Sequence, residues 1–315
     1  MGLLAIGEML IDLIPEPHPA GGPPCYRPYA GGAPANAAVA AARLGRRVRF
    51  WGRLSRDAFG QMLLAALEEE GVDTGFVQRA DDPTALAVVE LDAAGQRRFR
   101  FYHTDTADAG LDAAGLAEGL WVGMRIAHAG SVSLAALPAR EATLAALREA
   151  RARGLVVSLD VNARPGLWPQ PQELPAVTRE ALRLAEVVKL SDEDAAALQL
   201  EPDPVDWLLA EGAGLVLFTR GAAGARLASR RAQVEMEAFP VQAVDSTGAG
   251  DAFMGAALAW LLDRQLGAGE AGTLDAPDLR ALGRQAAAAG ALACTRRGGI
   301  ASLPDRAELE AFLKA

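Results

Sequence analysis

The chain has 315 residues, of which 51% are hydrophobic and 23% charged, proportions that suit a globular protein with a full core. They exclude a disordered or fibrous protein. The formal net charge of -9 gives a surface that repels phosphate backbones, so the sequence predicts no nucleic-acid partner.

No apolar run is long enough to span a bilayer, and the first residues lack the basic segment and cleavage site of a secretion signal. We therefore expect a cytoplasmic protein with no membrane partner. The two cysteines, Cys25 and Cys294, lie far apart and indicate neither a disulfide framework nor a zinc site.

Strands and helices are predicted to alternate along most of the chain. Short apolar runs rich in β-branched residues predict buried strands at 3–7, 47–54, 155–160, 186–191 and 214–221. Segments with helical period predict helices at 34–44, 57–70, 138–153, 172–185, 192–199, 204–212 and 278–293. This alternation predicts an α/β protein, in which helices cover both faces of a mostly parallel sheet in a three-layer αβα sandwich.

One region departs from this alternation. Residues 84–103 alternate with period two around an Asp-Ala-Ala-Gly turn, which predicts a β-hairpin. Residues 10–30 are extended and rich in Pro and Gly, so they can supply further strands beside it. We expect a single domain over 1–315 with a discontinuous β lid from about 10–30 and 84–103. Open strand edges in such a lid predict a homodimer.

The stretch DSTGAGDAF at 245–253 carries the strongest chemical signal, because a glycine-rich loop runs directly into an apolar helix. The amides of Gly248, Ala249 and Gly250, at the positive end of that helix, predict an anion hole. Asp251 follows in the first turn, where it would accept the proton of an attacking hydroxyl. The alternative is that Asp245 and Asp251 are an ordinary turn residue and helix-start acid. No Walker A lysine or dinucleotide fingerprint is present.

This stretch resembles the C-terminal signature of the ribokinase-like (PfkB) carbohydrate kinases. The stretch GGAPANAA at 31–38, followed by Arg-Leu-Gly at 43–45, resembles their N-terminal signature. The resemblance covers essentially the whole chain. It implies an ATP-dependent kinase in which the sugar lies between lid and sheet and ATP lies along the carboxyl ends of the strands.

The resemblance also implies roles for individual residues. Arg164 would act with Asp251 near the transferred phosphoryl group. The implied sugar-binding residues are Asp12, Gly31, Gly32, Asn36, Phe101, Tyr102, His103, Asp160, Asn162 and Asp251. From the residues alone, Asp12 could be a strand-end acid facing solvent, Asn36 a polar residue bonded to a neighbouring loop, and Arg164 part of a surface ion pair.

The implied nucleotide-binding residues are Lys189, Ser191, Thr219, Arg220, Gly221, Gly224 and the loop 248–250. Magnesium is implied with ATP. Relatives carry an Asn-x-x-Glu motif for it where this chain has Ser191-x-x-Asp194, which points to Asp194 and leaves Asp192 and Glu193 as alternatives. A monovalent cation such as K⁺ would be held, mostly through backbone carbonyls, by Asp245, Thr247, Ala293, Arg296, Gly298 and Ser302.

Within the family, FRFYH at 99–103, Ala107-Asp108 and DVNARPGLW at 160–168 resemble fructokinases, which implies conversion of fructose to fructose 6-phosphate. The alternative is a 2-keto-3-deoxygluconate kinase, although those enzymes generally carry arginine where this chain has His103. A different class is a sugar- or nucleotide-sensing protein without turnover. Such a protein would show damage at the base or anion hole, and both motifs are intact here.

Overall fold

An eight-stranded sheet forms the centre of the computed structural model, which describes residues 1–16, 25–91 and 97–314. Its strand order is β14-β13-β12-β11-β10-β9-β1-β4. These strands are β1 (Gly2–Ile6), β4 (Arg47–Trp51), β9 (Met124–Gly130), β10 (Val156–Asp160), β11 (Val187–Ser191), β12 (Leu215–Thr219), β13 (Ala225–Ser229) and β14 (Gln233–Met236). All neighbours from β4 to β12 are parallel, whereas β13 and β14 extend the sheet antiparallel.

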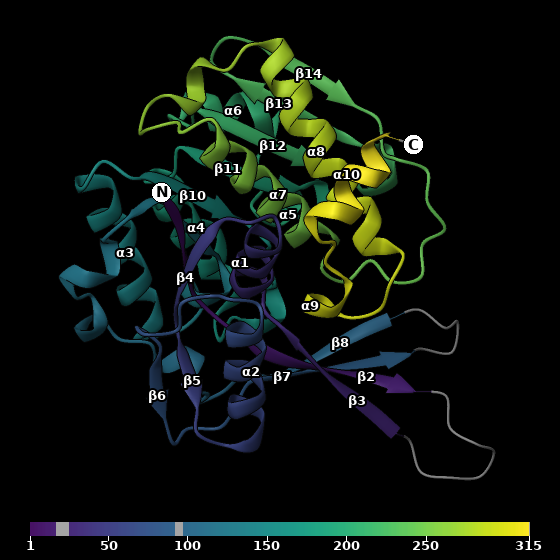
Figure 1. Cartoon of the computed structure of the whole chain (residues 1–315). Helices are drawn as coiled ribbons and strands as arrows, with labels where there is room; N and C mark the ends of the chain where they lie inside the picture. The colour runs from purple at the N-terminus through teal and green to yellow at the C-terminus, as the bar shows by residue number, and fades with distance from the viewer. Residues whose placement is uncertain (17–24, 92–96, 315) are drawn as a thin grey trace.

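Helices cover both faces of this sheet (Figure 1). One face carries α1 (Ala33–Arg43), α2 (Ala58–Glu69), α7 (Ala249–Asp263), α8 (Ala276–Cys294), α9 (Gly299–Ser302) and α10 (Arg306–Lys314). The other carries α3 (Ala139–Ala152), α4 (Leu174–Leu182), α5 (Asp192–Ala197) and α6 (Pro204–Ala210). Successive strand residues such as Leu3 and Leu4 enter separate apolar cores, one on each face. The predicted three-layer αβα sandwich is confirmed.

A separate four-stranded sheet projects from one end of the central sheet (Figure 1). Its order is β3-β2-β7-β8, with strands β2 (Leu10–Glu16), β3 (Cys25–Gly31), β7 (Leu86–Leu91) and β8 (Arg97–Tyr102). These strands come from the two segments predicted to form the lid, although the Asp-Ala-Ala-Gly turn lies outside the described residues. The action of this small sheet as a lid, and the single-domain organisation, stay predictions.

The strand predicted at 47–54 is wrong in its extent. It ends at Trp51, and β5 (Arg53–Ser55) instead pairs with β6 (Gln78–Ala80) in a two-stranded sheet. The break falls at Gly52, where a Cβ would lie 2.5 Å from the carbonyl oxygen of Gly7. The backbone of Gly7 lies so close to position 52 that only glycine fits there.

Short 3₁₀ turns connect the remaining elements: η1 (Asp108–Gly110), η2 (Ala113–Gly115), η3 (Glu118–Trp121), η4 (Val132–Leu134), η5 (Pro165–Leu167), η6 (Pro171–Glu173), η7 (Gly221–Ala223) and η8 (Ala271–Thr273). Several of them follow the carboxyl ends of sheet strands, where the loops gather at one edge. None of the helices in the described ranges combines the length and apolarity needed to cross a membrane.

Candidate active site

A cavity of about 610 Å³ opens between the small sheet and the loops that follow the parallel strands. It is lined by Glu8, Leu10, Asp12, Gly32, Ala33, Asn36, Phe101, Val132, Asn162, Ala163, Arg164, Leu167, Lys189, Glu193, Ser246, Thr247, Gly248, Gly250 and Asp251. In open parallel sheets, ligands bind outside the carboxyl ends of the strands. The cavity is therefore where the fold places a ligand.

The loop before α7 is arranged to bind an anion. Gly248, at φ +81°, caps the helix, and the first bond inside it runs from the amide of Ala252 to the carbonyl of Gly248 at 2.8 Å. The amides of Gly250 and Asp251 precede that bond, so they have no acceptor within the helix. They form the positive end of the helix dipole and point out of the helix, as an anion hole requires. The predicted set differs, because the amide of Ala249 already donates to the carbonyl of Ser246 at 3.2 Å.

Asp251 is held by a residue far away in sequence. Asn36 Nδ2 donates a 2.7 Å hydrogen bond to Asp251 Oδ2, joining residues 215 positions apart. The bond is possible because α1 and α7 pack tightly through small residues, and a Cβ on Gly255 would lie 2.5 Å from that of Ala40. Two sequence motifs thus meet at one carboxylate.

The electrostatics of this carboxylate favour proton transfer. Burial raises the pKa of Asp251 above its ordinary value, while the Asn36 hydrogen bond and the charges of Lys189 and Arg164 oppose the shift. Burial, with the charges of Asp251 and Asp245, raises the pKa of Asp12 to about 7. A carboxylate of raised pKa is a stronger proton acceptor than an exposed aspartate.

Lys189 and Asp160 form a buried ion pair beneath the anion-hole loop. Lys189 Nζ donates to both carboxylate oxygens of Asp160 at 2.8 Å. Burial alone would lower the pKa of Lys189, but Asp160, Asp194 and Asp251 more than offset that and raise it. A Cβ on Gly250 would lie 3.2 Å from Lys189 Nζ, which places the ammonium directly beside the loop.

Asp160 itself does not contact the cavity, contrary to the expectation that it binds sugar. Its side chain is 2% exposed, and both oxygens are occupied by Lys189. The residue after the strand, Asn162, does line the cavity, together with Arg164. Asp160 therefore holds the lysine in place.

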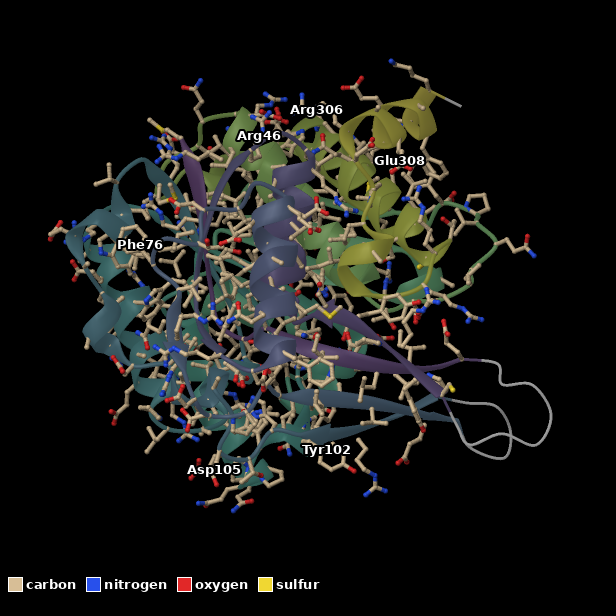
Figure 2. All side chains as sticks on the ribbon, turned by 60° about the horizontal axis from the view of Figure 1, so that its bottom comes forward. Arg46, Phe76, Tyr102, Asp105, Arg306 and Glu308 are labelled. Atoms are coloured by element: carbon tan, nitrogen blue, oxygen red, sulfur yellow. The ribbon has the colours of Figure 1, made fainter. Side chains whose placement is uncertain are left out.

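The end of β8 contributes one of its three predicted sugar-binding residues. Phe101 lines the cavity, whereas the neighbouring Tyr102 is 57% exposed and stands out from the small sheet in Figure 2. Adjacent strand side chains point to opposite faces, so both cannot face the same ligand. His103 lines a second cavity of about 440 Å³, which shares Phe101 and Leu167 with the first.

Gly31 and Gly32 both occupy positions where a side chain does not fit. A Cβ on Gly31 would collide with the Asp12 carboxylate, and one on Gly32 would lie 2.8 Å from the carbonyl oxygen of Glu8. Gly32 also has φ +111°, a conformation that favours glycine. Gly32 lines the cavity. Gly31 does not, but its lack of a side chain leaves room for the Asp12 carboxylate, which does.

The predicted nucleotide-binding turn lies at the end of β12, next to β11, and outside the walls of this cavity. Thr219 Oγ1 donates to the carbonyl of Leu190 at 3.4 Å, and Arg220 pairs with Glu235. Gly221 begins η7, and Gly224 approaches the backbone of β14.

Ser191 and Asp194 form a capping box at the start of α5. Asp194 Oδ2 accepts from the Ser191 amide at 2.8 Å, while Oδ1 accepts from the Ala163 amide at 2.6 Å. Both oxygens of Asp194 are thus bonded to backbone, whereas Glu193 lines the cavity. No group of three or more His, Cys, Asp or Glu side chains in the described part of the chain could hold a metal ion.

The segments predicted to hold a monovalent cation lie side by side. The carbonyl of Cys294 accepts from the amide of Asp245, and Asp245 Oδ2 accepts from the amide of Gly298 at 3.2 Å. Asp245 Oδ1 also accepts from Thr247, and Ser302 Oγ lies 3.5 Å from the Thr247 carbonyl. The side chain of Arg296 is bonded to Glu308, and the carbonyl of Ala293 accepts from the Arg296 amide.

Gly298 is also the point at which the small sheet touches this loop. A Cβ there would lie 2.5 Å from the ring of Tyr29 on β3. Its φ of +91° favours glycine independently. Strand β3 therefore rests on the loop that follows α8.

Sequence reasoning missed Glu8 as a site residue. It follows Gly7 at the end of β1, is 2% exposed and lines the cavity, and its Oε2 has no hydrogen-bond partner among the described residues. Burial, with added repulsion from Asp108 and Asp251, raises the pKa of Glu8 to about 8. The available signal was an acid interrupting an otherwise apolar N-terminal segment.

The raised pKa of Asp12 predicts how stability changes with pH. Above about pH 4 the unfolded chain releases the Asp12 proton, whereas the folded chain retains it to about pH 7. The contribution of Asp12 to the stability of the folded protein therefore falls as pH rises over this range. We expect Asp12→Asn to become progressively more stable than the parent protein between pH 4 and 7.5. The gain is at most about 4 kcal/mol, for roughly three pKa units at about 1.4 kcal/mol each.

Denaturant unfolding at several pH values, without ligands, measures this difference. Glu8→Gln should show the same sign, because the pKa of Glu8 is raised as well. A stability difference that stays constant over the range would contradict the assigned protonation of Asp12.

The model of the pfkB family carbohydrate kinases matches residues 2–306 of this chain. The chain belongs to this family. A relative from Arabidopsis thaliana, "Probable fructokinase-4", is 36% identical over 99% of this chain and 96% of its own length. These two findings confirm the resemblance stated from the sequence.

Solved structures agree with the family assignment. A fructokinase from Xylella fastidiosa with bound ATP is 36% identical, covers 99% of this chain and 98% of its own, and superposes with a TM-score of 0.93. A fructokinase from Vibrio cholerae O395, bound to fructose, ADP and calcium, is 33% identical, with a TM-score of 0.85 and coverage of 99% and 98%. As a pfkB carbohydrate kinase, the chain is a phosphotransferase with an alcohol acceptor.

Proposed function

We propose that this protein transfers the γ-phosphoryl group of ATP to the primary hydroxyl of fructose, giving fructose 6-phosphate. The observation that carries the proposal is Asp251, held by Asn36 beside the amides of Gly250 and Asp251, which have no acceptor within α7. The similar proteins are named fructokinases, and one solved structure contains ATP and another contains fructose.

In this proposal Asp251 accepts the proton of the attacking hydroxyl. Asn36 donates to Oδ2 and so fixes the orientation of the carboxylate. The amides of Gly250 and Asp251, with the ammonium of Lys189 beside them, stabilise the negative charge on the transferred group. Arg164, a planar donor that lines the same cavity, orients a phosphoryl oxygen.

The residues present fit magnesium held largely by phosphates. Magnesium usually binds proteins through one or two carboxylates plus phosphates and water, and it neutralises phosphate charge when bound. We propose Glu193 as the carboxylate that faces it, because Asp194 uses both oxygens to bond backbone amides. The oxygens gathered around Asp245 and Thr247 would suit K⁺.

We also propose that the small sheet covers the acceptor. Its outer strands, β3 and β8, end the strand order, so their open edges are free to pair with a second copy in a homodimer. A cytoplasmic location, where ATP is abundant, suits the proposed reaction.

Activity on a panel of acceptors tests the substrate. We expect ADP release with Mg-ATP to be fastest for fructose among fructose, 2-keto-3-deoxygluconate, ribose, mannose and adenosine. The physical reason is that the cavity is lined by the acids Glu8, Asp12 and Asp251, which suit hydroxyls better than a carboxylate. A highest kcat/KM for any acceptor in the panel other than fructose would refute the fructose assignment.

A further inference from the structure

The turn that follows β10 has a strained residue in it. Asn162 lies at φ +37°, in the left-handed region, which asparagine tolerates better than most residues but still at a cost in energy. Asn162 and Arg164, two positions further on, both line the cavity. A strained backbone conformation persists only where the surrounding structure fixes it. The contacts that hold this turn therefore decide where two cavity side chains lie.

Two bonds hold the amides on either side of Asn162. The Val161 amide donates to the carbonyl of Lys189 at 2.9 Å, which continues the ladder between the neighbouring strands β10 and β11 (Figure 1). The Ala163 amide donates to Asp194 Oδ1 at 2.6 Å. The first bond joins backbone to backbone and needs no particular side chain. The second requires an acceptor side chain at position 194.

Asp194 is itself fixed in place. It is 3% exposed, and its Oδ2 accepts from the Ser191 amide at 2.8 Å. Ser191 Oγ in turn accepts from the Asp194 amide at 3.1 Å, which completes the capping box of α5. The capping box needs no bond outside its own helix, so the bond to Ala163 is additional. It ties the turn after β10 to the start of the helix after β11.

We propose that Asp194 is a positioning residue, which holds Asn162 and Arg164 in the cavity through the amide of the residue between them. This inference rests on the proposed function, in which Arg164 orients a phosphoryl oxygen, and it adds that Asn162 binds the acceptor. It also gives Asp194 a task other than facing magnesium. The adjacent Glu193, which lines the cavity, is the carboxylate proposed for that task, so the two acids have separable effects.

Removing the acceptor oxygens tests the positioning. We expect Asp194→Ala to raise the Kd for fructose about tenfold in calorimetry without nucleotide, the effect of losing one hydrogen bond when Asn162 is displaced. The kcat should fall as well, because phosphoryl transfer is sensitive to small displacements of Arg164. Asp194→Asn keeps one acceptor oxygen for two amides, so its losses should be smaller. Asp275→Ala removes a helix-start acid from α8 and, as the matched control, should retain the parent values.

Amide hydrogen exchange gives a readout that does not depend on turnover. Without ligands, we expect the Ala163 amide to exchange about tenfold faster in Asp194→Ala than in the parent protein, because the bond that protects it is lost. If Asp194→Ala fails to fold, Asp194→Asn is compared with the parent protein in the same way. An unchanged Kd for fructose, or unchanged exchange at Ala163, in a folded variant would overturn the role of Asp194.

A magnesium titration separates positioning from metal binding. The Mg²⁺ concentration that gives half of the maximal rate should be unchanged in Asp194→Ala and raised in Glu193→Gln, because Glu193 is the acid of the two that lines the cavity. The reverse pattern, with the Kd for fructose at its parent value, would overturn the proposal and assign Asp194 to the metal.

The two proposals fail in different ways. A parent protein that prefers another neutral sugar, with the Kd for that sugar raised by Asp194→Ala, refutes the fructose assignment and supports the positioning. A parent protein that uses fructose, with a Kd indifferent to Asp194, refutes the positioning alone.

Discussion

Replacing Asp251 by asparagine is expected to lower kcat for sugar-dependent ADP release by about 10²–10⁴-fold, the usual contribution of a general base. Asparagine occupies the same volume and can still accept the hydrogen bond from Asn36, but it cannot take a proton. Steady-state kinetics with fructose and Mg-ATP measure the loss. The Kd for ATP, from calorimetry, should change little, because the anion hole is built from backbone.

The matched control is Asp263→Asn, the same substitution at the last residue of the same helix. Asp263 is half exposed and pairs with Arg46 at the surface, so this variant should retain the parent kcat. An Asp251→Asn protein with near-parent turnover would remove Asp251 from the role of base.

Lys189→Met is expected to lower the free energy of unfolding by about 3–5 kcal/mol. The substitution leaves the Asp160 carboxylate buried at 2% exposure without the ammonium that both of its oxygens accept from. Denaturant unfolding at pH 7 measures the effect. Arg148→Met is the matched control, because its pair with Glu180 is exposed and should contribute less than about 1 kcal/mol.

The double variant Lys189→Met with Asp160→Leu separates a charge effect from lost packing. Removing both charges should restore most of the stability, since an apolar pair of similar volume replaces the buried ions. It should not restore turnover, because the ammonium beside the anion hole is missing. A double variant as unstable as Lys189→Met would show that packing, rather than the unpaired carboxylate, causes the loss.

The alternation of apolar runs and amphipathic helices was sufficient to predict the layered sheet, because that period reflects burial directly. The alternation did not predict that β4 ends at Trp51, just before Gly52. The cause is the close approach of the Gly7 backbone to Gly52, which the amino-acid composition does not reveal. Three strands of the sheet were also missed: β9, near its centre, and the antiparallel β13 and β14 at one end. Their short mixed sequences lack a clear period.

The candidate site was predictable where backbone geometry dictates residue type. The loop before α7 needs glycine, and Asp251 follows it at fixed spacing. The prediction for Asp160 did not anticipate Lys189, because pairing across neighbouring strands depends on register that one sequence does not reveal. The prediction for His103 did not anticipate Asp108, five residues further on, because that contact depends on how the chain turns after β8. Glu8 was overlooked for the same reason: its importance comes from burial beside segments distant in sequence.

The contact between Tyr29 and Gly298 has a consequence for anyone redesigning this enzyme. The ring of Tyr29 joins β3 of the small sheet to the loop bonded to Asp245, with no space left between them. A substitution that shifts β3 must therefore displace the loop around Gly298 as well. Under the proposed function, the sheet that covers the acceptor and the loop that leads to the phosphate site move together, so libraries that vary Tyr29 should vary its neighbours around Gly298 at the same time.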